Sequence, residues 1–170
     1  MLRIMKDVYT HLKNDDGTRT VDTVKFPIDP NDTRPLYTIL GLADKTAFHK
    51  HVVPGPQYVT IEDSVPLIKH HVRMTSYDTA TTYRYIELQF LAFSSDSSYQ
   101  EITSIIARLR ALFNGQIPYN SCPANARYSM PFHLYRDPGP ADSGIDGICS
   151  AFISFRGATD MTLNLIGQSI

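Results

Sequence analysis

The sequence TYRYIELQFLAFSSDSSYQEITSIIARLRALFNG, residues 82–115, places a strand pattern directly before a helix pattern. In its first part apolar residues alternate with other side chains, which is the two-residue period of a β-strand. One face would hold Ile86, Leu88, Phe90 and Ala92, and the other Tyr85, Glu87, Gln89 and Leu91. We therefore predict a central strand over Thr82–Ser94.

The second part of this stretch predicts the best-defined helix of the chain. Ser98 and Glu101 form a Ser-x-x-Glu box, which satisfies the free amide groups at a helix start. Asn114-Gly115 predicts a left-handed cap at the helix end. Between them runs an apolar stripe at helical spacing, made of Ile102, Ile105, Ile106, Leu109, Leu112 and Phe113. We expect this stripe to pack on the sheet.

The residues before this unit predict one helix and two weaker strands. Leu2–Leu12 has apolar residues at helical spacing, and the turn residues Asn14–Gly17 follow it. Thr20–Ile28 is rich in strand formers but meets prolines, which predicts at best an edge strand. Gln57–Glu62 predicts a short strand. The Pro and Gly residues within Asn31–Pro56 predict a long irregular insertion.

The residues after the unit predict a hairpin with a long tip. Arg127–Tyr135 and Gly147–Arg156 both alternate as strands do. Between them, Asp137–Asp146 consists of turn chemistry throughout, which predicts a flexible surface tip. Ala158–Ile170 shows no decisive period, and we expect an extended arm or a short terminal strand there.

The length of 170 residues predicts a single α+β domain over residues 1–170, since it is close to the usual length of one domain. A chain of this length can bury about 70% of the surface that its unfolded form exposes. It therefore needs neither a metal ion nor a disulfide for stability.

The charge balance and the apolar runs narrow the range of partners. The 16 Lys and Arg residues nearly match the 17 Asp and Glu residues, so we expect no direct sequence-specific binding of nucleic acid. Apolar runs such as Leu88–Phe93 are far shorter than the roughly 20 residues that span a bilayer, which predicts no membrane partner. Met1–Lys13 lacks the features of a secretory signal, which predicts a cytoplasmic protein.

Six histidines raise the question of a metal site. His49 and His51 would face the same way on a strand, and His70-His71 lies nearby in sequence. A metal ion needs three or four converging ligands, so we expect solvated loop histidines and no metal. Neither a G-x-S-x-G elbow nor a phosphate-binding glycine loop is present, and we expect no cofactor.

The other reactive residues do not predict an enzyme. Cys122 and Cys149 have no C-x-x-C spacing, which predicts buried free thiols. Asp142 and Asp146 would sit on the flexible tip, where nothing desolvates them or shifts their pKa values. We therefore expect a protein that binds other protein surfaces rather than a catalyst.

Ten tyrosines and no tryptophan fit that expectation, because tyrosine is enriched at protein interfaces. Ordinary half-buried strand tyrosines explain the same count equally well. The tyrosines near predicted strand edges or loops are Tyr77, Tyr83, Tyr85, Tyr119 and Tyr128.

Four stretches carry a resemblance to a known family: PGPQYVTIED at 54–63, YRYIELQFLAFSS at 83–95, IIARLRALFNG at 105–115 and GICSAFISFR at 147–156. With the N-terminal helix pattern, their order resembles the tail-terminator, or tail-completion, proteins of long-tailed bacteriophages. The resemblance covers most of the chain. The strand, Ser-rich turn and helix unit is its most telling part.

The resemblance implies a mostly antiparallel sheet packed against two amphipathic helices, with long irregular loops. It implies no catalytic residues. Such a protein assembles in the host cytoplasm into a homo-oligomeric ring, a hexamer, that caps the tail tube protein in the virion neck and joins it to the head-completion or stopper protein.

The sheet edges of such a ring, here the Thr20 segment and the closing strands, would continue the sheet across the subunit boundary. Loops within Thr33–Pro56 and Asp137–Asp146 would reach neighbouring rings. The interface candidates on loops and edges are Arg34, Tyr37, His49, His51, Tyr83, Tyr85, Asp137, Asp142 and Asp146.

Two alternatives stay open. A head-completion or adaptor protein of the same neck would use similar loops to bind the portal. A small soluble enzyme would need a convergent cleft of acidic and histidine side chains.

Overall fold

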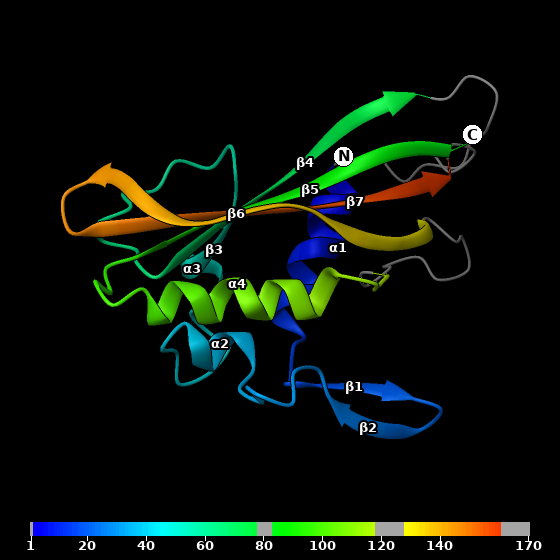
Figure 1. The fold of residues 1–170 in the computed structure, drawn as a ribbon, viewed down its shortest axis with the longest axis horizontal. Helices are drawn as coiled ribbons and strands as arrows, with labels where there is room; N and C mark the ends of the chain where they lie inside the picture. The colour runs from blue at the N-terminus through cyan, green and yellow to red at the C-terminus, as the bar shows by residue number, and fades with distance from the viewer. Residues whose placement is uncertain (1, 78–82, 118–127, 161–170) are drawn as a thin grey trace.

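The computed structural model describes residues 2–77, 83–117 and 128–160 and has an α+β architecture. A five-stranded sheet in the order β3-β4-β5-β7-β6 carries the helices on one face, and a two-stranded hairpin stands off on the same side (Figure 1). The elements in chain order are α1 (Leu2–Lys13), β1 (Thr18–Val21), β2 (Val24–Pro27), α2 (Leu36–Ile39), α3 (Phe48–His51), β3 (Val52–Pro54), β4 (Leu67–Tyr77), β5 (Tyr83–Ser94), α4 (Gln100–Phe113), β6 (Tyr128–Ile145) and β7 (Ile148–Asp160).

Strand β5 lies in the middle of the sheet, as its alternation predicts. It pairs antiparallel with β4 and with β7, so that Leu88 lies between Val72 and Phe155. The predicted inner face is confirmed, because all four of its residues are fully buried: Ile86, Leu88, Phe90 and Ala92. The only parallel pairing among the described strands joins β3 to β4.

Helix α4 packs its apolar stripe against this inner face, and all six predicted residues are buried. Its N-terminal cap differs from the prediction. The carboxylate of Asp96 accepts hydrogen bonds from the amides of Ser98 at 2.9 Å and Glu101 at 3.0 Å. The carboxylate of Glu101 accepts a hydrogen bond from the hydroxyl of Ser94 at 2.5 Å. The predicted box is wrong because the turn brings Asp96 to the helix start, where its charge also suits the helix dipole.

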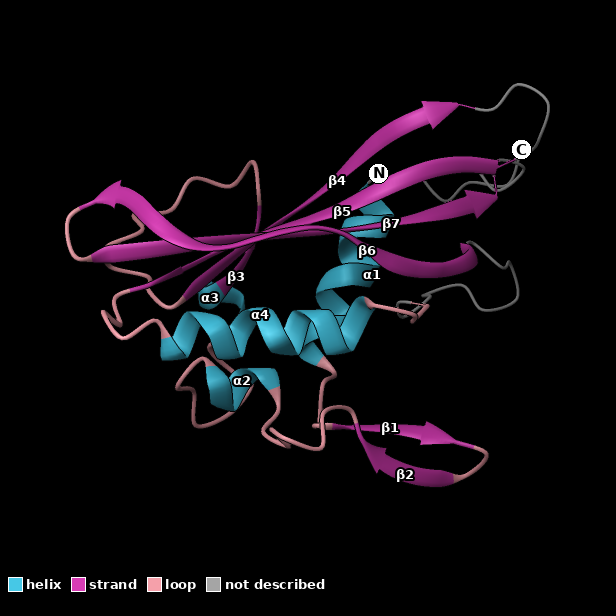
Figure 2. Cartoon of the chain, in the orientation of Figure 1, coloured by secondary structure: helices cyan, strands magenta, loops and turns pink. Residues whose placement is uncertain are grey.

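Helix α1 is the second amphipathic helix, and it confirms the prediction for Leu2–Leu12. It lies on the same face of the sheet as α4 (Figure 2). Its Ile4, Val8 and Leu12 belong to the same core cluster as the inner faces of β4 and β5. Neither α1, α4 nor any shorter helix in the described ranges has the length and apolar character needed to cross a membrane.

Residues 31–56 are not the irregular insertion that their prolines and glycines predict. They contain α2, α3 and β3, which are short but supply part of the main core. The reason is that each of the two four-residue helices points one or two large apolar side chains inward. Pro35 and Gly41 only mark the two ends of α2. The buried residues of this segment are Leu36, Ile39, Leu40, Phe48, Val52 and Val53.

One further prediction in the first half is wrong, and one strand was not predicted. Gln57–Glu62 is an irregular segment rather than a strand. Its Val59 and Ile61 still pack on the outer face of the sheet, in a small cluster around Leu67 and Phe93. The missing strand is β4, which begins at Leu67, just after this segment.

The predicted long tip at Asp137–Asp146 is also wrong. Strand β6 runs through that segment to Ile145, and a two-residue turn, Asp146-Gly147, joins it to β7. The strand accommodates the turn-forming residues through register shifts, with Gly139 and Gly144 at positive φ. Strand β7 confirms the prediction for Gly147–Arg156. Of the expected arm, residues 158–160 extend β7, and residues 161–170 lie outside the described ranges.

Candidate protein-interaction surfaces

The β1–β2 hairpin presents an apolar face to the surroundings. The edge strand predicted for Thr20–Ile28 does not join the main sheet and is instead part of this separate two-stranded ribbon. In the ribbon Val21 pairs with Val24, and Arg19 pairs with Phe26. Paired residues share one face of a ribbon, so the three apolar side chains lie together. They are about half exposed, at 48% for Val21, 52% for Val24 and 47% for Phe26. An isolated two-stranded hairpin is marginally stable in water, so this face is suited to contact with another surface.

The base of the hairpin is held by Asp15, a buried residue. Its carboxylate accepts hydrogen bonds from the amide of Gly17 at 2.8 Å and from the amide of Leu36 at 2.7 Å. The amide of Ile28, just after β2, donates to the carbonyl oxygen of Gly17, just before β1, at 3.0 Å. These bonds hold the hairpin at a fixed place on the body.

The guanidinium of Arg108 on α4 adds a further set of contacts at the base of the hairpin. We call Asp15 and Arg108 together the clamp. Arg108 is 2% exposed, and its Nε lies 3.7 Å from Oδ2 of Asp15. Its Nη2 donates to the carbonyl oxygens of Asp32 and Arg34. In the sequence, Arg108 stands within the apolar face of α4, and a charged residue at such a position indicates a buried charge. Arg108 was not identified in this way from the sequence.

A second candidate surface is the outer face of the sheet, away from the helices. The register places Lys69 and Arg73 of β4 on this face with Leu91 and Glu87 of β5. On β7, Arg156 and Phe152 lie opposite the same two residues of β5. We call this surface the basic groove, defined by Lys69, His71, Arg73, Leu91, Phe152 and Arg156. Its Lys69, His71, Leu91 and Phe152 line one open cavity together with Gly55 and Pro56.

Arg156 is ordered by two neighbours within the basic groove. Its guanidinium stacks on the ring of Tyr135 at 3.4 Å from the ring centroid, and its Nε lies 4.0 Å from the carboxylate of Glu87. Glu87 is 2% exposed, and its carboxylate also accepts a hydrogen bond from the side-chain Nε2 of Gln89 at 3.2 Å. The one carboxylate on this part of β5 is thus already engaged.

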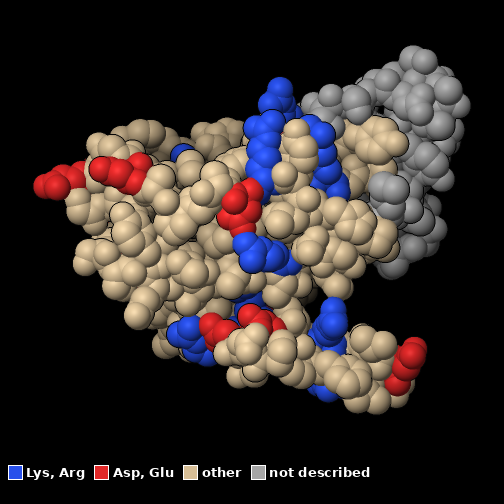
Figure 3. Space-filling model, in the orientation of Figure 1, with Lys and Arg blue, Asp and Glu red and all other residues tan. Residues whose placement is uncertain are grey.

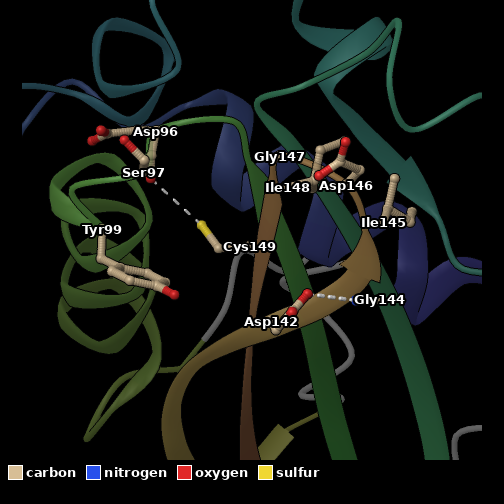
Figure 4. A pocket seen from close by; sticks show the side chains of 10 residues that line it. All are labelled: Asp96, Ser97, Tyr99, Asp142, Gly144, Ile145, Asp146, Gly147, Ile148 and Cys149. Carbon is tan, nitrogen blue, oxygen red and sulfur yellow. Dashed lines mark hydrogen bonds between the residues drawn. The ribbon is translucent and has the colours of Figure 1, made fainter.

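The third surface is a pocket between the β6–β7 turn and the start of α4 (Figure 4). Its lining holds three carboxylates and no basic residue. We call it the acidic turn, defined by Asp96, Asp142 and Asp146. Hydrogen bonds lower the pKa of Asp96, first from the Ser98 hydroxyl and then from backbone amides, so this carboxylate stays ionised while it caps α4.

The thiol of Cys149 lies beside the acidic turn. Burial raises the pKa of this free, buried thiol, and its Sγ donates to the carbonyl oxygens of Ser94 at 3.4 Å and Asp96 at 3.8 Å. A protonated, hydrogen-bonded thiol is a poor nucleophile. The prediction of a buried thiol is confirmed for Cys149, whereas Cys122 lies outside the described ranges.

The predicted interface residues do not converge on one surface. Asp142 and Asp146 meet at the acidic turn, while Asp137 forms an ion pair with Arg110 of α4. The remaining candidates lie at other places in the fold. Arg34 is exposed and paired with Asp32, Tyr37 packs on the core, Tyr85 is 43% exposed on β5, and Tyr83 begins β5.

The histidines have separate environments. His49 and His51 lie on the helical turn α3 rather than on a strand, and their Nδ1 atoms lie 3.1 Å and 2.8 Å from the carbonyl oxygens of Thr46 and Pro66. His70 is buried in the core, against the prediction of a solvated loop residue, because it faces inward from β4. In the described ranges, no three His, Cys, Asp or Glu side chains are grouped closely enough to hold a metal ion.

Sequence reasoning missed the apolar face of the hairpin and the basic groove. Val24 and Phe26 alternate with polar residues, which is a strand signal, but only the tertiary structure separates that strand from the main sheet. The basic groove draws its charges from β4 and β7, which are far apart in sequence. No protein-family model matches the chain, and no curated protein matches it either.

Proposed function

We propose that this chain is a structural protein of the neck of a long-tailed bacteriophage, where it forms a homo-oligomeric ring, a hexamer, in the virion. The ring caps the tail tube and joins it to the head-completion or stopper protein. In this role the chain works by protein contact, is not an enzyme and uses no cofactor.

The β1–β2 hairpin is the observation that carries this proposal. Three large apolar side chains share one half-exposed face of a ribbon that stands off the body. Contiguous exposed apolar surface on a rigid support is typical of a protein–protein contact. The clamp of Asp15 and Arg108 gives the ribbon a fixed position on the subunit, as a repeating contact in a ring requires.

The arrangement of the main elements also supports the proposal. The resemblance to tail-terminator proteins depends on an N-terminal helix, a short strand at 54–63, a long central strand, a polar turn, an amphipathic helix and a closing strand. The short strand is not formed as predicted, because residues 57–62 are irregular. The chain has α1, β5, α4 and β7 in this order, with residues 95–99 as the turn. Strand β6, by contrast, is poorly suited to pair with a neighbour, because its prolines and register shifts disrupt a regular edge.

Native mass spectrometry and electron microscopy of the purified protein, alone and with tail tubes, test the proposal. We expect closed rings of one size, either free or seated on tube ends. A protein that stays monomeric at all concentrations, and that neither binds nor caps tail tubes, would contradict the proposal. Rings that bind the portal but not the tube would assign the chain to the head side of the neck instead.

A further inference from the structure

Part of the described chain covers one end of the outer face of the sheet. Near the β6–β7 turn, Val59 and Ile61 pack on the cluster around Leu67 and Phe93. Leu91 packs at the border of this cluster, and the basic groove extends from Leu91 along β4, β5 and β7. The helices of the described ranges all lie on the other face of the sheet, so none of them covers the basic groove (Figure 2).

The basic groove combines an apolar floor with an excess of positive charge. Leu91 and Phe152 pair in the register of β5 and β7 and form the floor. Lys69 stands beside it, and Arg73 and Arg156 lie further along the same face, on either side of Glu87. The carboxylate of Glu87 is 2% exposed and offsets one of these three charges. The remaining positive charge favours an acidic partner.

The acidic turn lies at another part of the same molecule. Asp142 and Asp146 are exposed, and no basic residue lines their pocket. In the space-filling view acidic side chains lie at the end of the long axis where Figure 1 places the β6–β7 turn, whereas a group of Lys and Arg side chains lies over the middle of the molecule, with an acidic group among them (Figure 3). One subunit therefore carries two surfaces of opposite charge, and the two pockets share no lining residue.

We infer that the basic groove of one copy binds the acidic turn of a second copy. Asp142 and Asp146 then pair with Lys69 and Arg73 across the boundary, and the turn covers the apolar floor. Two different surfaces of the same chain make a heterologous contact, and such a contact closes into a ring when the rotation between copies is right. This inference rests on the proposed function, because it names the surfaces that join the subunits of the ring.

Charge reversal on both sides tests the pairing. The two double variants are Asp142→Lys with Asp146→Lys, and Lys69→Glu with Arg73→Glu. Arg73, Asp142 and Asp146 are exposed, and Lys69 is partly buried. We expect the affinity of self-association to fall at least about tenfold in each double variant, since like charges then face each other. The variant with all four substitutions restores opposite charges and should recover the wild-type ring. Thermal unfolding checks that all three variants fold.

Salt and cross-linking give independent measurements. Self-association of the wild type should weaken as ionic strength rises, because exposed charge pairs are screened. A zero-length carbodiimide reagent should link Lys69 of one copy to Asp142 or Asp146 of another, detected in mixed samples of isotopically light and heavy protein.

The outcomes separate this inference from the proposed function. A wild-type ring that both double variants also form would overturn the pairing and leave the ring intact. Loss of the ring in both double variants without recovery in the fourfold variant would show that each surface binds something else. A Lys69→Glu, Arg73→Glu protein that loses binding to a heparin column but keeps its ring would assign the basic groove to a polyanion. A wild type that never assembles, with or without tail tubes, would overturn both.

Discussion

Arg108 and Asp15 form a buried ion pair that joins α4 to the base of the β1–β2 hairpin. Their side chains are 1% and 0% exposed, and 3.7 Å separates Nε from Oδ2. At this distance the contact is an attraction between charges rather than a hydrogen bond. Asp15 uses its oxygens for the amides of Gly17 and Leu36, so one carboxylate connects three segments of the chain.

Replacing Arg108 by Met should destabilise the protein strongly. The substitution leaves the carboxylate of Asp15 buried without its positive partner, and the cost of breaking a buried pair in this way is about 3–5 kcal/mol. Urea unfolding measures it. Arg110→Met on the same helix is the matched control, because Arg110 is 49% exposed in its pair with Asp137 and should contribute less than about 1 kcal/mol. Equal effects of the two substitutions would contradict the clamp.

Gly17→Ala should displace the hairpin. Gly17 has φ +82°, and a Cβ atom there would overlap the carbonyl oxygen of Thr33. Gly41→Ala is the control, because Gly41 has φ +72° but no atom lies within 4 Å of its added Cβ. The control should cost only the backbone strain of about 1 kcal/mol, and Gly17→Ala clearly more. Thermal unfolding distinguishes the two, and a smaller loss at Gly17 would contradict the close approach.

Val24→Ser with Phe26→Ser should abolish the contact that the hairpin makes. Both side chains are about half exposed, so we expect a small change in the free energy of unfolding, within roughly 1 kcal/mol. Ring formation or binding to tail tubes should be lost, measured by native mass spectrometry and by co-sedimentation. Thr20→Ser with Lys25→Ser changes the opposite face of the ribbon and should leave both intact. Unaltered assembly of the Val24, Phe26 variant would place the contact elsewhere.

Ile106→Asp should unfold the domain. Ile106 is 6% exposed in the apolar stripe of α4, and an unpaired carboxylate at that position costs several kcal/mol, comparable with the whole stability of an ordinary domain. Thr103→Asp is exposed on the same helix, near its N-terminus, and should have little effect. Circular dichroism at rising temperature compares them. An unchanged melting temperature for Ile106→Asp would show that α4 does not pack there.

Acid should destabilise the protein through His70. Burial lowers the pKa of His70 to about 4, with a smaller effect from His71, whereas an unfolded histidine has a pKa of about 6.5. Between these values the unfolded chain binds the extra proton, so stability is complete above pH 6.5 and falls as the pH drops towards 4. The loss should approach about 3 kcal/mol.

Urea unfolding across this pH window measures that loss. His70→Leu should lose less stability than the wild type between pH 6.5 and pH 4. His49→Leu, at an exposed position, should follow the wild type. If the His70→Leu and wild-type curves stay parallel, His70 does not bind the proton.

The sequence by itself determined the elements whose pattern is local. The alternation of β5 and β7 and the stripe of α4 each repeat at the period of one secondary structure, and burial of one face follows directly from that period. These residues fixed the α+β class and the inner face of the sheet. Local pattern also placed α1, because Leu2–Leu12 has the spacing of an amphipathic helix.

The tertiary structure alone decided where irregular segments go and which distant residues meet. Prolines and glycines predicted loops at 31–56 and 137–146, but packing against α4 and pairing with β7 made ordered structure of both. Asp15 and Arg108 show the same limit. A turn aspartate and a helix arginine each have an ordinary local explanation, and their attraction depends on a distance that only the folded chain sets, because electrostatic contacts carry no sequence period.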